Sequence, residues 1–268
     1  APASAAPSRA PLAFIFVVVL LDLLGATLLI PVAAYIVREY NTDALSVGLL
    51  SVIYSAAQFL AAPLLGRLSD RYGRRPLLLL CLVGSAFGYV LFGIGGALWV
   101  LFLSRFIDGV TGGNLSVAQA YIADVTPPEE RAKNYALIGA AFGLGFILGP
   151  VLGGAFAQIS LAAPAYAAGA LSLLSAIVGF FVLPESLPPE KRLTGRISFA
   201  DVNPLGSIAG MARRSGLGMI LLANVVFNVA FSGFVSNIAV YLIGRFAVQP
   251  ADIAALLTVT GVVNVIMQ

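Results

Sequence analysis

Long apolar stretches of about 20 residues, each ended by a polar or proline-containing break, divide this sequence along most of its length. Membrane hydrocarbon offers no water to backbone polar groups, so stretches of this length are expected to be helices; a barrel would show ten-residue alternating strands instead. The pattern therefore predicts an all-helical membrane bundle. Its expected spans are residues 12–36, 45–65, 76–96, 98–122, 134–158, 164–183, 217–243 and 251–268.

A short basic segment sets the expected orientation of these spans. Residues 66–75 read GRLSDRYGRR and lie between two apolar stretches. Loops rich in arginine are retained on the cytoplasmic side of a membrane. With this segment inside, twelve of the 15 lysines and arginines lie in cytoplasmic loops, Arg38 and Arg245 lie outside, and Arg105 falls within a span. The sequence predicts a multi-pass protein of the cytoplasmic (inner) membrane whose N-terminus is cytoplasmic.

Composition agrees with this assignment and excludes several kinds of site. Apolar residues make up 60% of the chain and charged residues 10%, and the mean hydropathy is +0.99, outside the range of soluble domains. The chain has no histidine and one cysteine, Cys81, so no histidine proton relay, internal disulfide, metal site or cofactor is expected. The net charge of +3 comes from the loops and indicates no nucleic-acid partner.

Repeated positions indicate how the chain is organised. A shift of 86 residues places Asp22 over Asp108 and Leu29 over Leu115, which relates the first span to the fourth. Units of three spans insert with alternating orientation, as in alternating-access transporters. We therefore expect a cytoplasmic tail, a six-helix bundle of two inverted repeats, a cytoplasmic loop and the start of a second, incomplete bundle. These regions are residues 1–11, 12–183, 184–216 and 217–268.

Three charged residues fall well inside the predicted spans, where each costs roughly 2.5–3.5 kcal/mol at the centre of a membrane. Asp22, Arg105 and Asp108 should therefore face a cavity or one another. Because the chain lacks histidine, we expect Asp22 and Asp108 to carry a coupling proton and Arg105 to adjust their proton affinity. Alternatively, Arg105 and Asp108 form a self-contained pair, one helical turn apart, that only offsets its own burial.

Polar residues at helical spacing mark the expected wall of a substrate cavity. In the fourth span the set that should share one face is Arg105, Asp108, Gly112, Ser116 and Gln119. In the seventh span the set is Asn224, Asn228, Ser232 and Ser236. The expected contacts to a small-molecule substrate are Gln119, Asn114, Asn224, Asn228 and Ser232.

Two motifs resemble signatures of one protein family. Residues 66–75 resemble the loop signature of the major facilitator superfamily, and residues 145–154, GFILGPVLGG, resemble the fifth-helix motif of its antiporters. From residue 12 to about residue 190 the chain is similar to the twelve-helix drug:proton antiporters, the tetracycline-exporter branch in particular.

Each motif has an expected physical role. The first motif has glycines for close helix approach, an aspartate that could lie near a helix N-terminus, and arginines that could pair with it or bind lipid phosphate, which suits a latch for one conformation. A plain positive-inside anchor is the alternative. The latch residues are Gly66, Asp70, Arg71, Gly73, Arg74 and Arg75. The second motif permits close packing and a bend through Gly145, Gly149, Pro150, Gly153 and Gly154.

The resemblance implies a function, and three departures restrict it. It implies a non-enzymatic secondary transporter that couples protons to the efflux of amphipathic small molecules by alternating access, in the lipid bilayer. Thr27, Ala34 and Gly88 stand where the exporters carry a glycine, a proline and an acidic residue, and the last difference argues against tetracycline itself. Helices nine to twelve have no counterpart, so those helices or a larger membrane complex are expected partners. The alternative function is a transport-inactive accessory or scaffold subunit.

Overall fold

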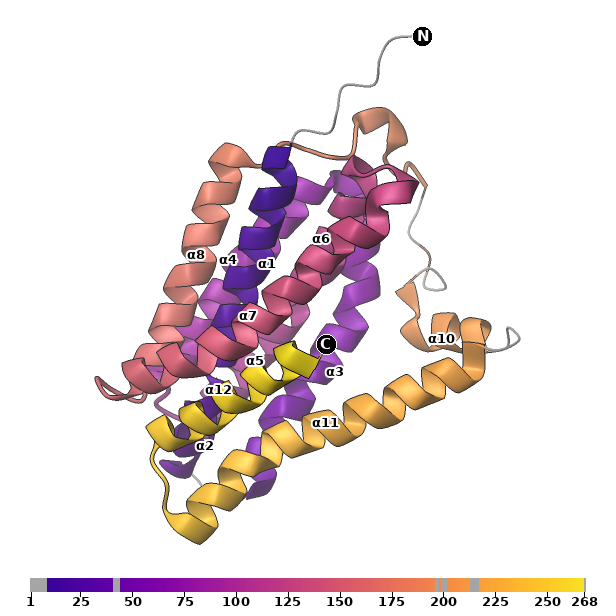
Figure 1. Ribbon diagram of the computed structural model, residues 1–268. Coiled ribbons are helices and arrows are strands. Elements are labelled where there is room, and N and C mark those ends of the chain that lie inside the picture. Colours follow the sequence, from indigo (N-terminus) through magenta and orange to yellow (C-terminus); the bar gives the residue numbers. More distant parts are fainter. Residues whose placement is uncertain (1–8, 41–43, 196–197, 199–201, 213–216, 268) are drawn as a thin grey trace.

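Helices are the only regular secondary structure in the computed structural model, which describes residues 9–40, 44–195, 198, 202–212 and 217–267 (Figure 1). The α-helices are α1 (Arg9–Leu28), α2 (Ile30–Arg38), α3 (Ala44–Tyr72), α4 (Arg74–Ile94), α5 (Leu98–Thr111), α6 (Asn114–Val125), α7 (Arg131–Ala157), α8 (Ala163–Val182), α10 (Pro204–Ala212), α11 (Leu217–Phe246) and α12 (Pro250–Met267). Two 3-10 helices, η1 (Pro128–Glu130) and η2 (Pro189–Lys191), lie in the connections. The all-helical prediction is confirmed.

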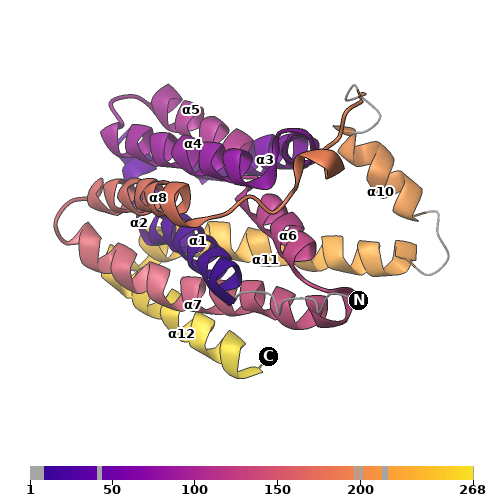
Figure 2. The same ribbon diagram turned by 90° about the horizontal axis from the view of Figure 1, so that it is seen from above.

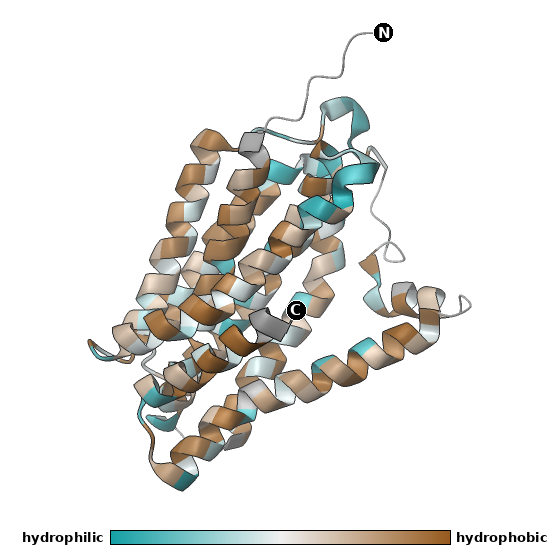
Figure 3. Ribbon diagram, viewed as in Figure 1, coloured by the Kyte–Doolittle hydropathy of each residue, from teal (hydrophilic) through white to brown (hydrophobic). Residues whose placement is uncertain are grey.

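Each predicted span corresponds to one helix or to two consecutive helices. Six stretches are long and apolar enough to cross a membrane: α1 with α2, α3, α4, η1 with α7, α8, and α11. The predicted fourth span is divided between α5 and α6, and a shorter apolar helix, α12, occupies the eighth. Hydrophilic residues are concentrated at the end of the bundle where α1 begins and where η1 and η2 lie (Figure 3).

The first span is interrupted in its C-terminal half. Leu29 separates α1 from α2, and Pro31 lies in the first turn of α2. Proline has no backbone N–H and its ring crowds the preceding turn, so it is accommodated where a helix begins. Because of this break, the axis of α2 need not continue that of α1.

The fourth span breaks at Gly112 and Gly113, which the sequence prediction missed. The expectation that Arg105 to Gln119 form one continuous helical face is therefore wrong. Two adjacent glycines weaken a helix because their backbone is the most costly to order. The side-chain amide of Gln58, on α3, donates a 2.9 Å hydrogen bond to the carbonyl of Gly112 and satisfies an acceptor that the break exposes.

The glycines of α7 lie where neighbouring helices approach most closely. A Cβ on Gly149 would collide with the hydroxyl of Thr27, and one on Gly153 would collide with the carbonyl of Leu28, both on α1. A Cβ on Gly145 would lie 3.0 Å from that of Leu23, and one on Gly154 would lie 2.7 Å from that of Ala254 on α12. Lipid-embedded helices associate largely through such close packing. These glycines, with Pro150 inside the same helix, join α7 to α1 and α12.

The basic segment is mostly helical, which corrects two expectations. Residues 66–72 form the last turns of α3, and the turn itself is reduced to Gly73, whose φ is 108°. Asp70 therefore lies in the last turn of α3, and its side chain reaches that of Arg74, the first residue of α4. Gly66 serves no close helix contact in this conformation, since a Cβ built there would meet no described atom within 4 Å.

The last two helices make very different contacts with the rest. Figure 2 shows α12 beside α7, and Ile253 and Leu257 of α12 join Ala34 and Ile243 in a buried apolar cluster. The long helix α11 joins this cluster only near its C-terminal end, and the most apolar part of its length is not buried at all. In Figure 1, the other end of α11 stands away from the bundle beside α10.

Candidate functional site

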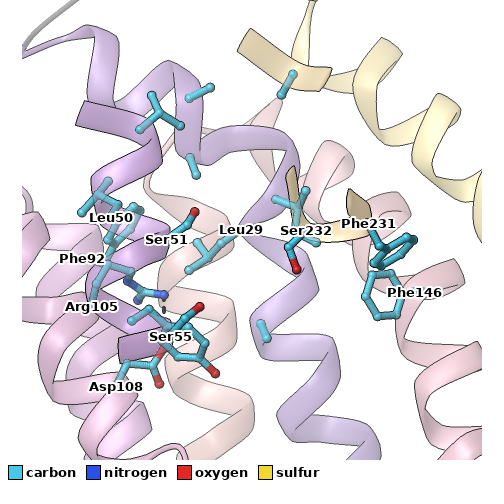
Figure 4. Close-up of a pocket in the computed structure, with 17 residues that line it drawn as sticks. Leu29, Leu50, Ser51, Ser55, Phe92, Arg105, Asp108, Phe146, Phe231 and Ser232 are labelled. Carbon is cyan, nitrogen blue, oxygen red and sulfur yellow. Dashed lines mark ion pairs between the residues drawn. The ribbon is translucent and has the colours of Figure 1, made fainter. Parts of the chain in front are cut away.

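A cavity of about 340 Å³ (Figure 4) lies among the helices, in the half of the bundle nearer to α2. Its lining residues are Ala26, Leu29, Ile30, Ala33, Ala34, Val47, Leu50, Ser51, Tyr54, Ser55, Phe92, Arg105, Asp108, Phe146, Phe231, Ser232 and Ala239. Among the described residues the lining is mainly apolar, its charges are on Arg105 and Asp108, and its other polar groups are hydroxyls. Such a mixture, apolar walls with a few convergent polar groups, is typical of small-molecule sites.

Arg105 and Asp108 form an ion pair on α5, one helical turn apart. Nη1 of Arg105 lies 3.1 Å from Oδ2 of Asp108, and the two side chains are only 13% and 4% exposed. The guanidinium carbon also lies 4.6 Å from the centre of the Phe92 ring and 5.4 Å from that of Tyr89, so two aromatic faces stabilise the cation. The predicted pairing is observed.

The guanidinium of Arg105 has unused hydrogen-bonding capacity. Its Nε and Nη2 atoms are buried, and no described residue accepts a hydrogen bond from either. Since buried charged donors are normally paired, the Asp108 contact does not complete the environment of this arginine.

Gly88 explains how α4 and α5 approach each other at this pair. A Cβ built on Gly88 would lie 3.0 Å from the Cβ of Asp108 and 3.2 Å from the carbonyl of Ser104. A larger side chain would therefore meet the backbone of α5. The absence of an acidic side chain here leaves Asp108 as the only carboxylate in the cavity lining.

Asp22 is held by Asn114, a residue 92 positions away in the sequence. The amide Nδ2 of Asn114 donates a 2.8 Å hydrogen bond to Oδ1 of Asp22. Asn114 is 1% exposed and lies in the first turn of α6, directly after the helix break. It was predicted to contact substrate, but it lies outside the cavity lining because its amide is directed to Asp22. Asp22 itself does not line the cavity; it lies one helical turn before Ala26, the α1 residue that does.

The remaining polar residues of the fourth span line a separate hollow. Gly112, Ser116 and Gln119 border a second cavity of about 510 Å³, together with parts of α3 and α10. The break at Gly112 and Gly113 turns α6 away from α5, so Arg105 and Gln119 do not share a wall. Ser55 borders both cavities.

The polar stripe of α11 reaches the first cavity at one residue. Ser232 lines it, and the neighbouring Phe231 packs edge-on against Phe146 of α7, with ring centres 6.5 Å apart (Figure 4). Asn228 and Asn224 are exposed farther along α11 and are joined by a 3.0 Å side-chain hydrogen bond. The side chain of Ser236 lies outside the described residues.

A second charged cluster surrounds Arg74 at the polar end of the bundle, and all three guanidinium nitrogens have partners there. Nη2 lies 2.6 Å from Oδ1 of Asp70, Nε lies 3.0 Å from Oδ2 of Asp124, and Nη1 donates to the hydroxyl of Ser69 at 2.5 Å. The backbone N–H of Arg74 donates to Oε1 of Glu185 at 2.8 Å. Of these contacts, the sequence predicted only the pairing with Asp70.

Glu185 connects this cluster to the segment that follows α8. Its Oε1 also accepts backbone hydrogen bonds from Ser186 and Leu187, at 3.0 and 3.1 Å. A Cβ on Gly73 would collide with Oε2 of the same carboxylate, so the left-handed turn and the missing side chain are both required. Asp124 and Glu185 could have been suspected from the sequence, since both end a span on the side where the basic segment lies.

The other arginines of the segment make different contacts. Arg75 donates to the backbone carbonyl of Phe180 and lies over its ring, with 5.4 Å between the guanidinium carbon and the ring centre. Arg71 lies similarly over Tyr72, at 5.6 Å. Among the described residues, no group of three or more histidine, cysteine or acidic side chains could hold a metal ion.

The arrangement of helices, cavity and basic turn has counterparts among known proteins. A sequence model of the Major Facilitator Superfamily matches residues 15–268. The chain belongs to this superfamily. The family expected from the two motifs is thereby confirmed.

Superfamily members with similar sequences and structures include transport proteins from bacteria and humans. Tetracycline resistance protein, class C, of Escherichia coli is 37% identical over 258 residues, which cover 93% of this chain and 63% of that protein. Multidrug resistance protein 2 of Bacillus subtilis (strain 168) is 30% identical over 262 residues, covering 95% and 64%. The crystal structure of the human organic anion transporter is similar with a TM-score of 0.78 at 29% identity, covering 96% of this chain and 70% of that one. The chain spans just under two thirds of the length of the two bacterial relatives.

Proposed function

We propose that this major facilitator protein is a secondary transporter that exports amphipathic small molecules in exchange for protons by alternating access. The observation that carries the proposal is the position of Asp22. Its carboxyl group lies within a membrane-spanning helix, one turn before Ala26 of the apolar cavity, with the neutral amide of Asn114 as its described hydrogen-bond partner. A carboxyl group placed in this way is a functional feature in membrane proteins because it is costly to bury.

The packing of the two bundle ends supports alternating access. Near the end of α2, the hydroxyl of Tyr35 donates to the carbonyl of Val248, and the cluster around Ala34, Ile243 and Ile253 closes the space between α2, α11 and α12. At the opposite end α11 stands away from the bundle (Figure 1). Contact between α11 and the bundle at one end and separation at the other is what one state of a rocking transporter would show.

The Arg74 cluster gives the open end a defined structure. It joins the ends of α3, α4 and α6 to the segment after α8 through charged hydrogen bonds. We propose that it holds these helix ends as one unit while the unit moves relative to α11 and the helices that follow it. The plain anchor role considered from the sequence would not require acidic partners from three elements.

In the proposed cycle Asp22 takes up and releases the coupling proton. Its hydrogen bond to Asn114 persists in either protonation state, since a carboxyl oxygen can accept from the amide in both. Asp108 is the second candidate, but its carboxylate is already paired with Arg105. The substrate would occupy the cavity between α1, α3, α5 and α11, in keeping with similar proteins named for resistance to tetracycline or multiple drugs and for organic anion transport.

Transport by the complete protein in proteoliposomes tests this proposal. The probes are labelled naphthylacetate, naphthylacetamide, naphthylethylammonium and ethidium, which share an aromatic body and differ in charge. We expect a pH gradient to drive accumulation of at least one probe, and an uncoupler to abolish it. Accumulation of none above empty liposomes would contradict the transport function and favour an accessory subunit.

The cytoplasmic location of the basic turn is tested separately. Single cysteines at Asp70 and Glu185, in a Cys81→Ser background, should be shielded from an impermeant thiol reagent added to intact cells. A cysteine at Glu39, at the opposite end of the bundle, serves as the labelled control. Equal labelling of all three would overturn the proposed orientation.

A further inference from the structure

We propose that the cavity around Arg105 selects organic anions, and that the acid group of the ligand binds the free edge of the Arg105 guanidinium. This inference rests on the proposed function, in which the cavity is the substrate site. It adds the charge of the substrate, which neither the transport function nor the family determines.

The first argument is the excess of hydrogen-bond donors at the site. Nε and Nη2 of Arg105 are buried and have no acceptor among the described residues. The two atoms lie on the same edge of the planar guanidinium, which is the edge that a carboxylate, sulfonate or phosphate binds through two parallel hydrogen bonds. A ligand that supplies two acceptor oxygens would satisfy both donors at once.

The second argument is that Asp108 does not occupy this edge. Its Oδ2 contacts Nη1, on a different edge of the guanidinium, at 3.1 Å. Asp108 and a ligand acid would therefore use different edges of the Arg105 guanidinium. Because Nε and Nη2 are covered in this conformation, the ligand reaches them after the guanidinium turns toward the cavity, which the flexible stem of an arginine allows.

The third argument concerns the other residues of the cavity. Ser51, Ser55 and Ser232 can each donate to a ligand oxygen, and Figure 4 shows the first two near the Arg105 side chain. Among the described lining residues the one carboxylate, on Asp108, is already paired, so an organic cation would find an arginine with two free donors and no free anion. The site therefore favours negative charge over positive charge.

The fourth argument defines the body of the ligand. Phe146 and Phe231 face each other in an edge-on contact across the cavity from Arg105, and Leu29 lies between the two regions (Figure 4). These side chains offer an apolar surface with aromatic faces to a flat hydrophobic group. The expected ligand class is an aromatic or otherwise amphipathic organic acid.

Equilibrium binding to the purified complete protein in detergent, without any gradient, tests this inference. The probes are naphthylacetate, the neutral naphthylacetamide and the positively charged naphthylethylammonium. We expect naphthylacetate to bind at least tenfold more tightly than the other two. Arg105→Gln should remove this preference, and Arg105→Lys should weaken it because an ammonium group cannot form the two parallel hydrogen bonds.

The matched control is Arg245→Gln, which removes an exposed arginine outside the cavity and should leave the preference unchanged. Tighter binding of the amide or the amine, or an acid preference that survives in Arg105→Gln, would overturn the inference. So would the absence of binding by all three probes to protein that elutes as a single folded species. Proton-driven uptake of ethidium without acid preference would overturn the charge selectivity while leaving the transport function intact.

Discussion

Arg74 and Arg105 are both largely buried arginines beside an aspartate, yet their surroundings differ. Every guanidinium nitrogen of Arg74 has a partner in the chain: Asp70, Asp124 or Ser69. Arg105 has a partner for Nη1 alone, and the rest of its guanidinium lies against aromatic rings with two donors unpaired.

The difference indicates what each arginine does. A fully paired buried charge is costly to disturb, so the Arg74 cluster fixes the relative positions of helix ends. A buried arginine with unpaired donors adds little to the stability of the fold, because the cost of burying it is only partly offset. Its unpaired donors remain available to bind a ligand. The change in the free energy of unfolding should therefore differ between variants of the Arg74 site and variants of the Arg105 site.

Replacing Arg74 should have the largest effect on stability. Arg74→Ala removes three side-chain contacts and leaves Asp70 and Asp124 without their shared cation. Since both carboxylates are partly exposed, we expect a loss of roughly 3 kcal/mol, the lower end for breaking a buried ion pair. The measurement is the apparent free energy of unfolding in mixed micelles. Arg71→Ala, which removes an exposed side chain, should change it by less than about 0.5 kcal/mol.

Gly73→Ala should have the next largest effect, about 2 kcal/mol, because alanine is strained at a φ of 108° and its Cβ would collide with Glu185. The same unfolding measurement applies. In a Glu185→Ala background, Gly73→Ala should cost less than in the wild type, because only the backbone strain remains and the collision is absent. Unchanged stability in Gly73→Ala would show that the turn is not fixed as described.

Thr27→Val tests a neutral contact between α1 and α7. The hydroxyl of Thr27 donates to the carbonyl of Leu23 at 2.7 Å and lies 2.9 Å from that of Gly145. Valine keeps the shape and removes the hydroxyl, so we expect a loss of about 1 kcal/mol. A loss as large as that of Arg74→Ala would contradict the view that close glycine packing, more than this hydrogen bond, joins the two helices.

The double variant Arg105→Met/Asp108→Asn should have the smallest effect on stability, within about 0.5 kcal/mol of the wild type, because the ion pair and the unpaired donors are removed together and no charge is left buried. The same variant should lose proton-driven uptake of the panel probes. If it unfolds as easily as Arg74→Ala, Arg105 is a structural residue and the contrast between the two arginines fails.

Much of the fold followed from the sequence because it depends on local properties. Apolar length predicted the spans, a three-residue spacing predicted the Arg105 and Asp108 pair, and small residues predicted the tight packing of α7. Each of these signals lies within one helix, where periodicity determines which residues meet.

The remaining features depend on contacts between distant segments, which no local pattern encodes. Asn114 meets Asp22 across 92 positions, and the Arg74 backbone meets Glu185 across 111. The break at Gly112 and Gly113 was missed because apolar composition continues across it, and it moved Gln119 away from the cavity. The basic segment was taken as a loop, whereas most of it continues α3.

Substrate-induced proton release by Asp22→Asn tests the proposed coupling most directly. Asparagine keeps the size and the hydrogen-bonding oxygen that meets Asn114 but cannot take up a proton in this role. The measurement uses the complete protein in liposomes with a pH-sensitive dye and the panel probe that the wild type transports best; Glu190→Gln, an exposed acidic site, is the control. We predict that Asp22→Asn still binds the probe and exchanges it across the membrane but releases no protons, whereas the control behaves as wild type. Proton release by Asp22→Asn at the wild-type ratio to substrate would contradict this, and Asp108 would then be the residue to which coupling is assigned.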